Sequence, residues 1–151
     1  MFWMKKNAEP RNSVANIGVE HGKWGEDMAA LKLKSEGFEI LARNVRPYSR
    51  DRRLEIDIIA YEKETGTLVF VEVKQHSKHW EWEGDTRGVD VKKRQNMCKA
   101  CRAWLRAHPW DGGYRFDVIE VYGVPEGGKP EVRHIKRVNI FETKSRFVPY
   151  I

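Results

Sequence analysis

The stretch LEIDIIAYEKETGTLVFVEVK, residues 54–74, decides the fold, because two β-rich runs flank a polar turn in it. Gly66 marks the turn, so the two runs are predicted to form a β-hairpin. Three charged residues stand inside these runs: Asp57, Glu72 and Lys74. A buried charge is costly unless it is paired or bound to a metal ion, so these positions point to a specific role.

The alternation of side chains indicates the register of the hairpin. If Glu62 lies opposite Thr67, one face is entirely apolar and consists of Ile56, Ile58, Ala60, Val69, Val71 and Val73. On the other face Asp57 then lies opposite Glu72, with about 5 Å between their Cβ atoms. Lys74 shares this face, because side chains two residues apart on a strand point the same way. The register therefore predicts two acids and an ammonium group at one spot.

Two carboxylates this close repel each other unless a proton or a cation lies between them. A hard divalent cation such as Mg²⁺ takes oxygen ligands and often uses only one or two protein carboxylates. Such an ion activates water and stabilises charge on a phosphoryl oxygen. The alternative is a solvated polar face of an antiparallel sheet. Ile59 and Phe70 fall on the same face, which favours a partly covered surface over that alternative.

The remaining pattern predicts a mixed α/β domain. Helical spacing of Trp24, Met28 and Leu31 indicates a first helix, which is expected to begin at Gly22 and end at Gly37. The other expected elements are strands at 38–45, 54–61, 68–74 and 115–124, a second helix within 90–109, and a last strand within 131–141 with a short turn of helix. The order, roughly α-β-β-β-α-β, predicts a mixed β-sheet flanked by α-helices.

Composition and length limit the class of protein. The 151 residues suit one domain, expected over residues 15–142, with an irregular arm at 1–14 and a tail at 143–151. No run approaches the roughly 20 apolar residues that cross a bilayer, and the start lacks the apolar stretch of a signal peptide. Two cysteines make no disulfide framework, so we expect a cytoplasmic protein with no membrane partner. The net charge of +6 favours polyanion binding.

The predicted second helix carries basic residues that could bind phosphates. A stripe along one face consists of Lys92, Lys99, Arg102 and Arg106, and the start of the helix adds Lys93 and Arg94. The alternative is an ordinary solvated helix face. Cys98, Cys101 and Leu105 define another, buried side.

A zinc site is a weaker possibility in the same region. His76 and His79, together with Cys98 and Cys101, offer four ligands that suit zinc. Core spacing of the cysteines instead favours their packing as small apolar side chains. Two tryptophans, Trp80 and Trp82, could stack on unpaired bases or cover the sheet or a dimer partner.

Four segments carry a family resemblance: GEDMAALKLKSEGFEILARNVR, EIDIIA, LVFVEVK and RFDV. In this order and spacing they resemble the YraN family of uncharacterised bacterial proteins, over roughly residues 22–121. EID and EVK are similar to the two halves of the motif of the PD-(D/E)XK nuclease superfamily. That resemblance implies a restriction-endonuclease-like fold, and this branch is related to Holliday-junction resolvases.

The resemblance also implies roles for individual residues. Asp57, Glu72 and the carbonyl of Val73 match the ligands of a Mg²⁺ or Mn²⁺ ion, and Lys74 matches the catalytic lysine. Glu26 and Glu55 match further acids of the family's site. Glu26 has another explanation, since a negative charge in the first turn of a helix is favoured by the helix dipole.

The sequence departs from the family pattern at three positions. Leu54 replaces the usual glycine before Glu-Ile-Asp, and Gln75 and His76 replace a small residue and an arginine after EVK. These departures concern the choice of substrate more than the fold.

Together these features lead us to expect a metal-dependent endonuclease that hydrolyses phosphodiester bonds. DNA, branched or single-stranded, is the expected partner, although the motifs do not separate DNA from RNA. The alternative is a non-catalytic nucleic-acid-binding or adaptor domain that keeps the fold. Resolvase-like relatives suggest a homodimer.

Overall fold

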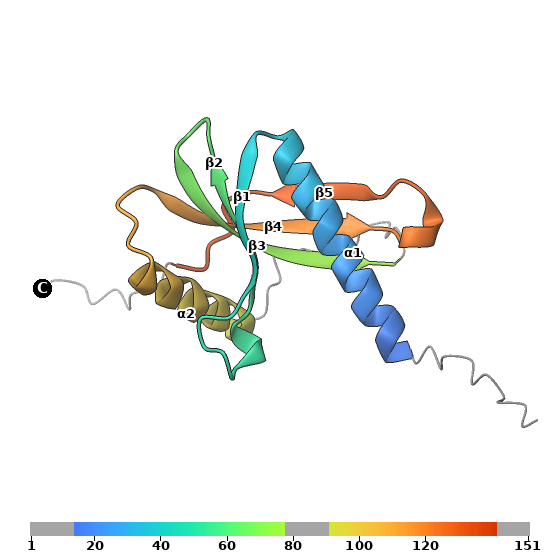
Figure 1. The fold of residues 1–151 in the computed structure, drawn as a ribbon, viewed down its shortest axis with the longest axis horizontal. Coiled ribbons are helices and arrows are strands. Elements are labelled where there is room, and N and C mark those ends of the chain that lie inside the picture. The colour runs from blue at the N-terminus through green and yellow to red at the C-terminus, as the bar shows by residue number, and fades with distance from the viewer. Residues whose placement is uncertain (1–13, 78–90, 142–151) are drawn as a thin grey trace, which may run out of the picture.

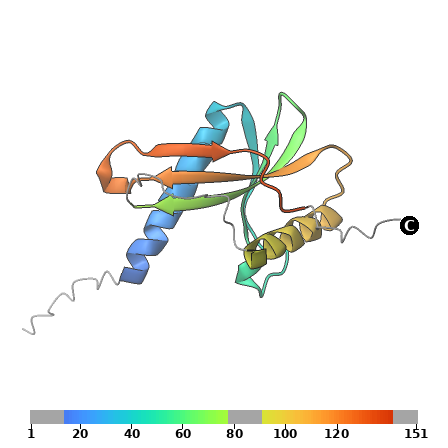
Figure 2. The same ribbon diagram turned by 180° about the vertical axis from the view of Figure 1, so that it is seen from behind.

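The structure is a computed structural model that describes residues 14–77 and 91–141. A five-stranded sheet lies between two α-helices (Figures 1 and 2), and the strands follow chain order across it, β1-β2-β3-β4-β5. The elements are α1 (Val14–Ser35), β1 (Phe38–Val45), the 3₁₀ turn η1 (Arg52–Leu54), β2 (Ile56–Glu62), β3 (Thr67–His76), α2 (Val91–Ala107), β4 (Tyr114–Tyr122), the 3₁₀ turn η2 (Pro125–Gly127) and β5 (Glu131–Ile135).

The sheet is mixed because α2 lies between β3 and β4 in the chain. A crossover of this length allows β3 and β4 to pair in parallel, whereas the other neighbouring strands pair antiparallel through short connections. The predicted α/β class with a mixed sheet flanked by helices is confirmed, and β5 is the last strand expected within 131–141, which the rough order α-β-β-β-α-β had left out. No helix of the described segments is long and apolar enough to cross a membrane.

The helix α1 begins earlier than predicted. It already includes Val14, whereas the sequence suggested a start at Gly22 and an arm that included residue 14. Gly18 and Gly22 misled the prediction, since both lie inside the helix with nothing near their Cα atoms for an added Cβ to meet. A solvent-facing glycine weakens a helix by only about 1 kcal/mol, which does not end it.

One face of the sheet packs against α1. The buried residues of this layer are Ala29, Ala30, Leu33, Phe38, Ile58, Ala60, Val69, Val71, Ile119 and Val121. Leu31, which was expected on the buried side, is 58% exposed, and Leu33 takes its place in the core. Trp24 and Met28 are partly buried and pack against this layer.

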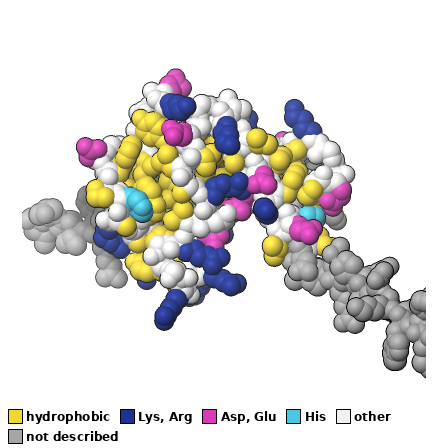
Figure 3. Space-filling view, in the orientation of Figure 1, with side chains coloured by type: hydrophobic (Ala, Val, Ile, Leu, Met, Phe, Trp, Pro, Cys, Tyr) yellow, Lys and Arg dark blue, Asp and Glu magenta, His cyan; other side chains and the backbone are white. Residues whose placement is uncertain are grey.

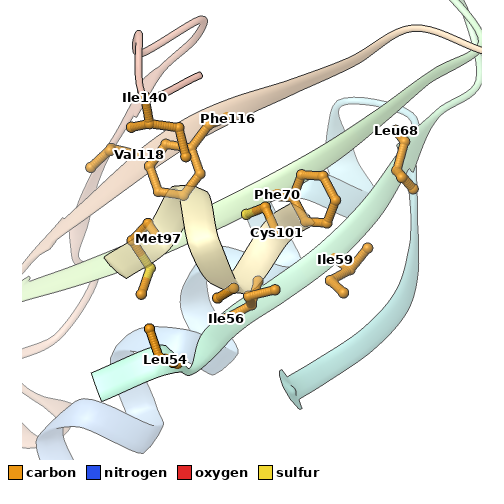
Figure 4. Close-up of a cluster of buried hydrophobic side chains, with 11 residues drawn as sticks. Leu54, Ile56, Ile59, Leu68, Phe70, Met97, Cys101, Phe116, Val118 and Ile140 are labelled. Carbon is orange, nitrogen blue, oxygen red and sulfur yellow. The ribbon is translucent and has the colours of Figure 1, made fainter. Parts of the chain in front are cut away.

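The opposite face packs against α2 (Figure 4). Its buried cluster consists of Leu54, Ile56, Ile59, Leu68, Phe70, Met97, Ala100, Cys101, Phe116, Val118 and Ile140. Burial of each large apolar side chain contributes about 1.5–3 kcal/mol before the loss of conformational entropy. Coverage of both faces explains why β2, β3 and β4 contain nearly continuous apolar runs.

A buried ionic network joins β4 and β5 to the end of α1. The His134 ring places Nδ1 2.8 Å from Glu36 Oε2 and Nε2 2.8 Å from Asp117 Oδ2. Arg115 also binds Asp117, with Nε to Oδ1 at 3.0 Å, and it contacts Glu62. Burial alone would lower the pKa of His134, but the hydrogen bonds to Asp117 and Glu36 outweigh it and raise that pKa.

The predicted strand limits agree closely with the structure. β1 matches its predicted range, and the other predicted strands differ by two residues or fewer at each end up to β4. After β5 the described chain runs on to residue 141 without a helical turn, and Arg137 there has a positive φ of 59°. The tail at 143–151 and nearly all of the predicted arm lie outside the described residues.

Candidate active site

The candidate site forms where β2 and β3 separate. Their paired register runs from Glu62–Thr67 to Ile58–Val71, as predicted from the alternation of side chains. Beyond Ile58 a side chain replaces the backbone pairing of the two strands. The Oδ2 atom of Asp57 accepts a hydrogen bond of 2.8 Å from the Val73 N–H. A side chain therefore holds the two strands together at the point where the backbone ladder ends.

This separation corrects one detail of the predicted hairpin. Ile56 was expected on the face of Ile58, but it packs with Phe70 in the cluster under α2. Ile58 lies in the layer under α1. The simple alternation therefore fails between these two residues, at Asp57.

Asp57 and Glu72 form a coupled pair of acids. Burial, together with the charge of Glu72, raises the pKa of Asp57 to about 7, although the Val73 N–H opposes the shift. Glu72 is itself only 6% exposed. When Asp57 ionises near neutral pH, two negative charges therefore lie close together in a poorly solvated corner of the sheet. A cation bound there would reduce the repulsion between them.

A pocket of about 460 Å³ opens beside this pair. Its lining combines acids with bases: Glu55, Asp57 and Glu72 with Arg52, Arg53, Lys92 and Lys93, together with Asn96 and Met97. In the space-filling view, acidic side chains lie in the middle of the molecule with Lys and Arg side chains around them (Figure 3). The pocket thus offers oxygen ligands for a cation next to donors for an anion.

Two further predicted acids, Glu26 and Glu55, lie beside the pair. Both add to the raised pKa of Asp57, so they are close enough to influence its charge. With its amide nitrogen turned toward the carboxylates, Asn44 donates to Glu26 Oε1 at 2.8 Å and to Glu55 Oε1 at 3.2 Å. Burial, more than the repulsion from Glu55, raises the pKa of Glu26. Arg46 binds the other oxygen of Glu55.

The position of Glu26 depends on a glycine. A Cβ added to Gly25 would lie 2.8 Å from the Cβ of Gln75, so α1 approaches β3 as closely as it does only because residue 25 lacks a side chain. Glu26 lies well inside the helix, twelve residues after Val14. The explanation of Glu26 as a first-turn acid that favours the helix dipole is therefore wrong.

Lys74 lies two residues beyond Glu72 on β3 and on the same face of the strand. It is half-buried, and it does not line the pocket. Within the described part of the chain, no ion pair or hydrogen bond of its ammonium group is found. Val73, whose carbonyl was a predicted metal ligand, lies between the two and gives its N–H to Asp57.

The basic residues predicted on α2 separate into two groups. Lys92 and Lys93 line the pocket, and Lys93 forms an ion pair with Glu72. The others lie farther along the helix: Lys99 packs over the Tyr48 ring, Arg102 donates to the Phe141 carbonyl and Arg106 donates to the Tyr48 hydroxyl. Arg94 is half-buried and does not line the pocket.

Sequence reasoning missed four polar residues of the site: Asn44, Arg52, Arg53 and Asn96. Arg52 and Arg53 stand in the stretch that was assigned only as a basic loop. Asn44, the penultimate residue of β1, has a positive φ of 51°. Asparagine is a poor strand former that tolerates this backbone conformation, and its presence in a strand was the available signal.

The cysteines behave as core residues and not as ligands. Cys98 and Cys101 are both buried, and burial raises the pKa of the Cys101 thiol. The His76 ring stacks on Tyr122. His79, Trp80 and Trp82 lie outside the described residues.

The acids of the site suit a hard divalent cation. In the portion of the chain that the structure describes, no three or more His, Cys, Asp or Glu side chains are grouped to hold a metal ion. Mg²⁺ and Mn²⁺ commonly bind through one or two carboxylates, with water and phosphate completing the shell. Glu72 is only 6% exposed, and burial and the charge of Glu72 raise the pKa of Asp57, so these two neighbouring carboxylates fit that mode of binding.

Fold and site together define a mixed α/β domain with a carboxylate pocket at the point where β2 and β3 separate. The chain belongs to the uncharacterised protein family UPF0102, whose family model matches residues 25–121. This confirms the YraN-like family membership expected from the sequence.

Individual relatives agree with this assignment. A UPF0102 protein of Halorhodospira halophila is 41% identical over 111 residues, which cover 74% of this chain and 84% of that protein. One from Pelobacter propionicus is 37% identical over 138 residues, which cover 91% and 93%. Among solved structures, that of Pyrococcus furiosus SfsA in complex with Ca²⁺ is similar over 82% of this chain and 63% of that one. Its sequence identity is 13% and its TM-score is 0.29, so it carries no further argument here.

Proposed function

We propose that the protein is a metal-dependent endonuclease that hydrolyses phosphodiester bonds in nucleic acid. One juxtaposition supports the proposal above all others. Asp57, with a pKa raised to about 7 beside Glu72, shares a pocket with four basic side chains. Acids alone would suit a cation and bases alone an anion, whereas a phosphodiester held against a divalent cation needs both.

In this proposal Asp57 and Glu72 hold Mg²⁺ or Mn²⁺, with Glu26 and Glu55 supporting the water around it. The cation supplies activation of water and neutralisation of charge on the phosphoryl oxygen. Lys74 does not line the pocket, but it lies on the same face as Glu72 and has a flexible stem, and in this proposal its ammonium group orients the attacking water and stabilises charge in the transition state. Arg52, Lys92 and Lys93 bind the phosphates on either side of the scissile bond.

DNA is the proposed substrate, and branched or single-stranded forms are the first to try, as the family resemblance implies. The purified protein is incubated with Mn²⁺ and with linear, single-stranded and four-way-junction DNA, and cleavage is followed on denaturing gels. We expect cleavage that needs the metal and that falls by at least about 10²-fold in Lys74→Ala and Glu72→Gln, as for other groups that stabilise transition-state charge. RNA is offered in parallel to separate the two substrates.

The second candidate is a non-catalytic nucleic-acid-binding domain, and the ion pair between Lys93 and Glu72 favours it. A carboxylate that already has a cationic partner has less need of a metal ion. Binding of DNA without cleavage under Mg²⁺, Mn²⁺ or Ca²⁺ would establish this candidate and refute the enzymatic one.

A further inference from the structure

The ion pair between Lys93 and Glu72 joins an exposed cation to a buried anion. The Lys93 side chain is 47% exposed, whereas the Glu72 side chain is 8% exposed. Lysine has a long flexible stem, so its ammonium group can leave the contact without disturbing the backbone of α2. Glu72 cannot move as freely, because its strand lies in the middle of the sheet.

The same carboxylate oxygens are those that a divalent cation would use. Lys93 contacts Oε1 of Glu72, on the wall of the pocket that Asp57 also lines. An ammonium group and a divalent cation at one carboxylate compete, since both draw on the same lone pairs and the same negative charge.

We propose that Lys93 is an exchangeable counter-ion. It neutralises Glu72 while the site lacks a divalent cation, it is displaced when the cation binds, and its freed ammonium group then binds a phosphate of the nucleic acid. This inference rests on the proposed cation site at Asp57 and Glu72 and goes beyond it, because it makes binding of the cation and of the nucleic acid interdependent.

The charges of the pocket support such an exchange. Four basic and three acidic side chains line it, so a divalent cation leaves it strongly positive and Lys93 without its partner. A phosphate is then the nearest compensating anion for the released ammonium group. By thermodynamic linkage, the cation must strengthen nucleic-acid binding by the same factor by which nucleic acid strengthens cation binding.

The first test measures the competition directly and needs no activity. Calorimetry at pH 8 gives the Kd of Mn²⁺ for the wild type, for Lys93→Met and for Lys92→Met. Lys92→Met removes the same charge from the same pocket and leaves the pair of Lys93 with Glu72 in place. We expect Lys93→Met to bind Mn²⁺ about threefold more tightly than Lys92→Met, since only the Lys93 ammonium group has to leave Glu72 when the ion binds.

Equal affinities in the two variants would overturn the counter-ion role while leaving the proposed cation site intact. Absence of Mn²⁺ binding in all three proteins would overturn the cation site, and the inference with it. The two failures are therefore distinguishable.

The second test follows the transfer of Lys93 to phosphate. Fluorescence anisotropy gives the Kd of a labelled single-stranded DNA with and without Mn²⁺, in proteins that also carry Lys74→Ala so that the DNA stays intact. We expect Mn²⁺ to tighten DNA binding about threefold or more with Lys93 present, and the gain to shrink in Lys93→Met but persist in Lys92→Met. An equal gain in all three proteins would refute the transfer.

Discussion

Asp57 is subject to two opposing influences. Its hydrogen bond from the Val73 N–H favours the ionised carboxylate, whereas burial and the charge of Glu72 favour the protonated form and win, with a pKa of about 7. Since the unfolded chain titrates near 3.8, the stability that this group contributes is fully present below about pH 4. It is lost as the pH rises through about 7. The ionised residue is therefore retained at the expense of stability, as is typical of functional sites.

At this scale we expect Asp57→Asn to stabilise the protein at pH 8. The amide oxygen can still accept from Val73, while the unfavourable charge is removed, and the free energy of unfolding should rise on the order of 1–2 kcal/mol. Urea denaturation without divalent cations measures it at pH 8 and at pH 5, where the gain should shrink. Asp111→Asn, at an exposed aspartate, is the control and should show no such change. A less stable Asp57→Asn at pH 8 would contradict the raised pKa.

At the scale of elements, the contact of α1 with β3 positions Glu26 beside the site. We expect Gly25→Ala to destabilise the protein by about 1–3 kcal/mol, because the new methyl group would lie 2.8 Å from the Gln75 Cβ. Gly22→Ala, one turn earlier in the same helix with nothing within 4 Å, should instead stabilise it by about 0.5–1 kcal/mol. Thermal denaturation compares the two, and a gain in stability for Gly25→Ala like that for Gly22→Ala would contradict the role of Gly25 in the close approach of α1 to β3.

The network around His134 joins three elements, and its strength should depend on pH. Both ring nitrogens face carboxylates, so the imidazolium form is the stabilising one. Its pKa is raised above 6.5, which means that its contribution is fully present below pH 6.5 and is lost as the pH rises through the folded value.

We therefore expect His134→Gln to lower the free energy of unfolding by about 1–3 kcal/mol at pH 6 and by clearly less at pH 9. Denaturant titrations at the two pH values measure this difference. His108→Gln, at an exposed histidine, provides the comparison. A loss for His134→Gln that is the same at both pH values would indicate a neutral ring.

At the scale of the whole molecule, the basic residues that give the net charge of +6 have different roles. Arg52 and Lys92 line the pocket, whereas Arg102 and Arg106 bind groups of the protein itself. If nucleic acid binds at the pocket, Arg52→Ala or Lys92→Ala should each lower the slope of log K against log salt by about 1. Arg102→Ala should change it less. Anisotropy titrations between low and moderate salt give the slopes, and equal effects at all three positions would place the binding surface along the whole helix.

The sequence predicted the sheet and the closeness of Asp57 to Glu72, but it did not predict the surroundings of these two acids. Alternation over residues 54–74 gave the register of β2 and β3, because a one-residue slip would have exposed an entire apolar face. It did not reveal that the ladder stops at Ile58, since the turn of Ile56 to the other face depends on packing against α2. Arg52 and Arg53 come from another element, and no local pattern places them at the pocket.

The hydrogen bond from Val73 to Asp57 also makes one peptide group a reporter of the site. Most amides in a sheet respond only to unfolding, whereas this one is bound to a side chain that gains or loses its proton near neutrality. Its proton resonance should therefore move with acidity and with occupancy of the neighbouring carboxylates, while ladder amides such as that of Val71 stay still. A single backbone signal can thus follow the chemistry of this pocket with neither a substrate nor a label.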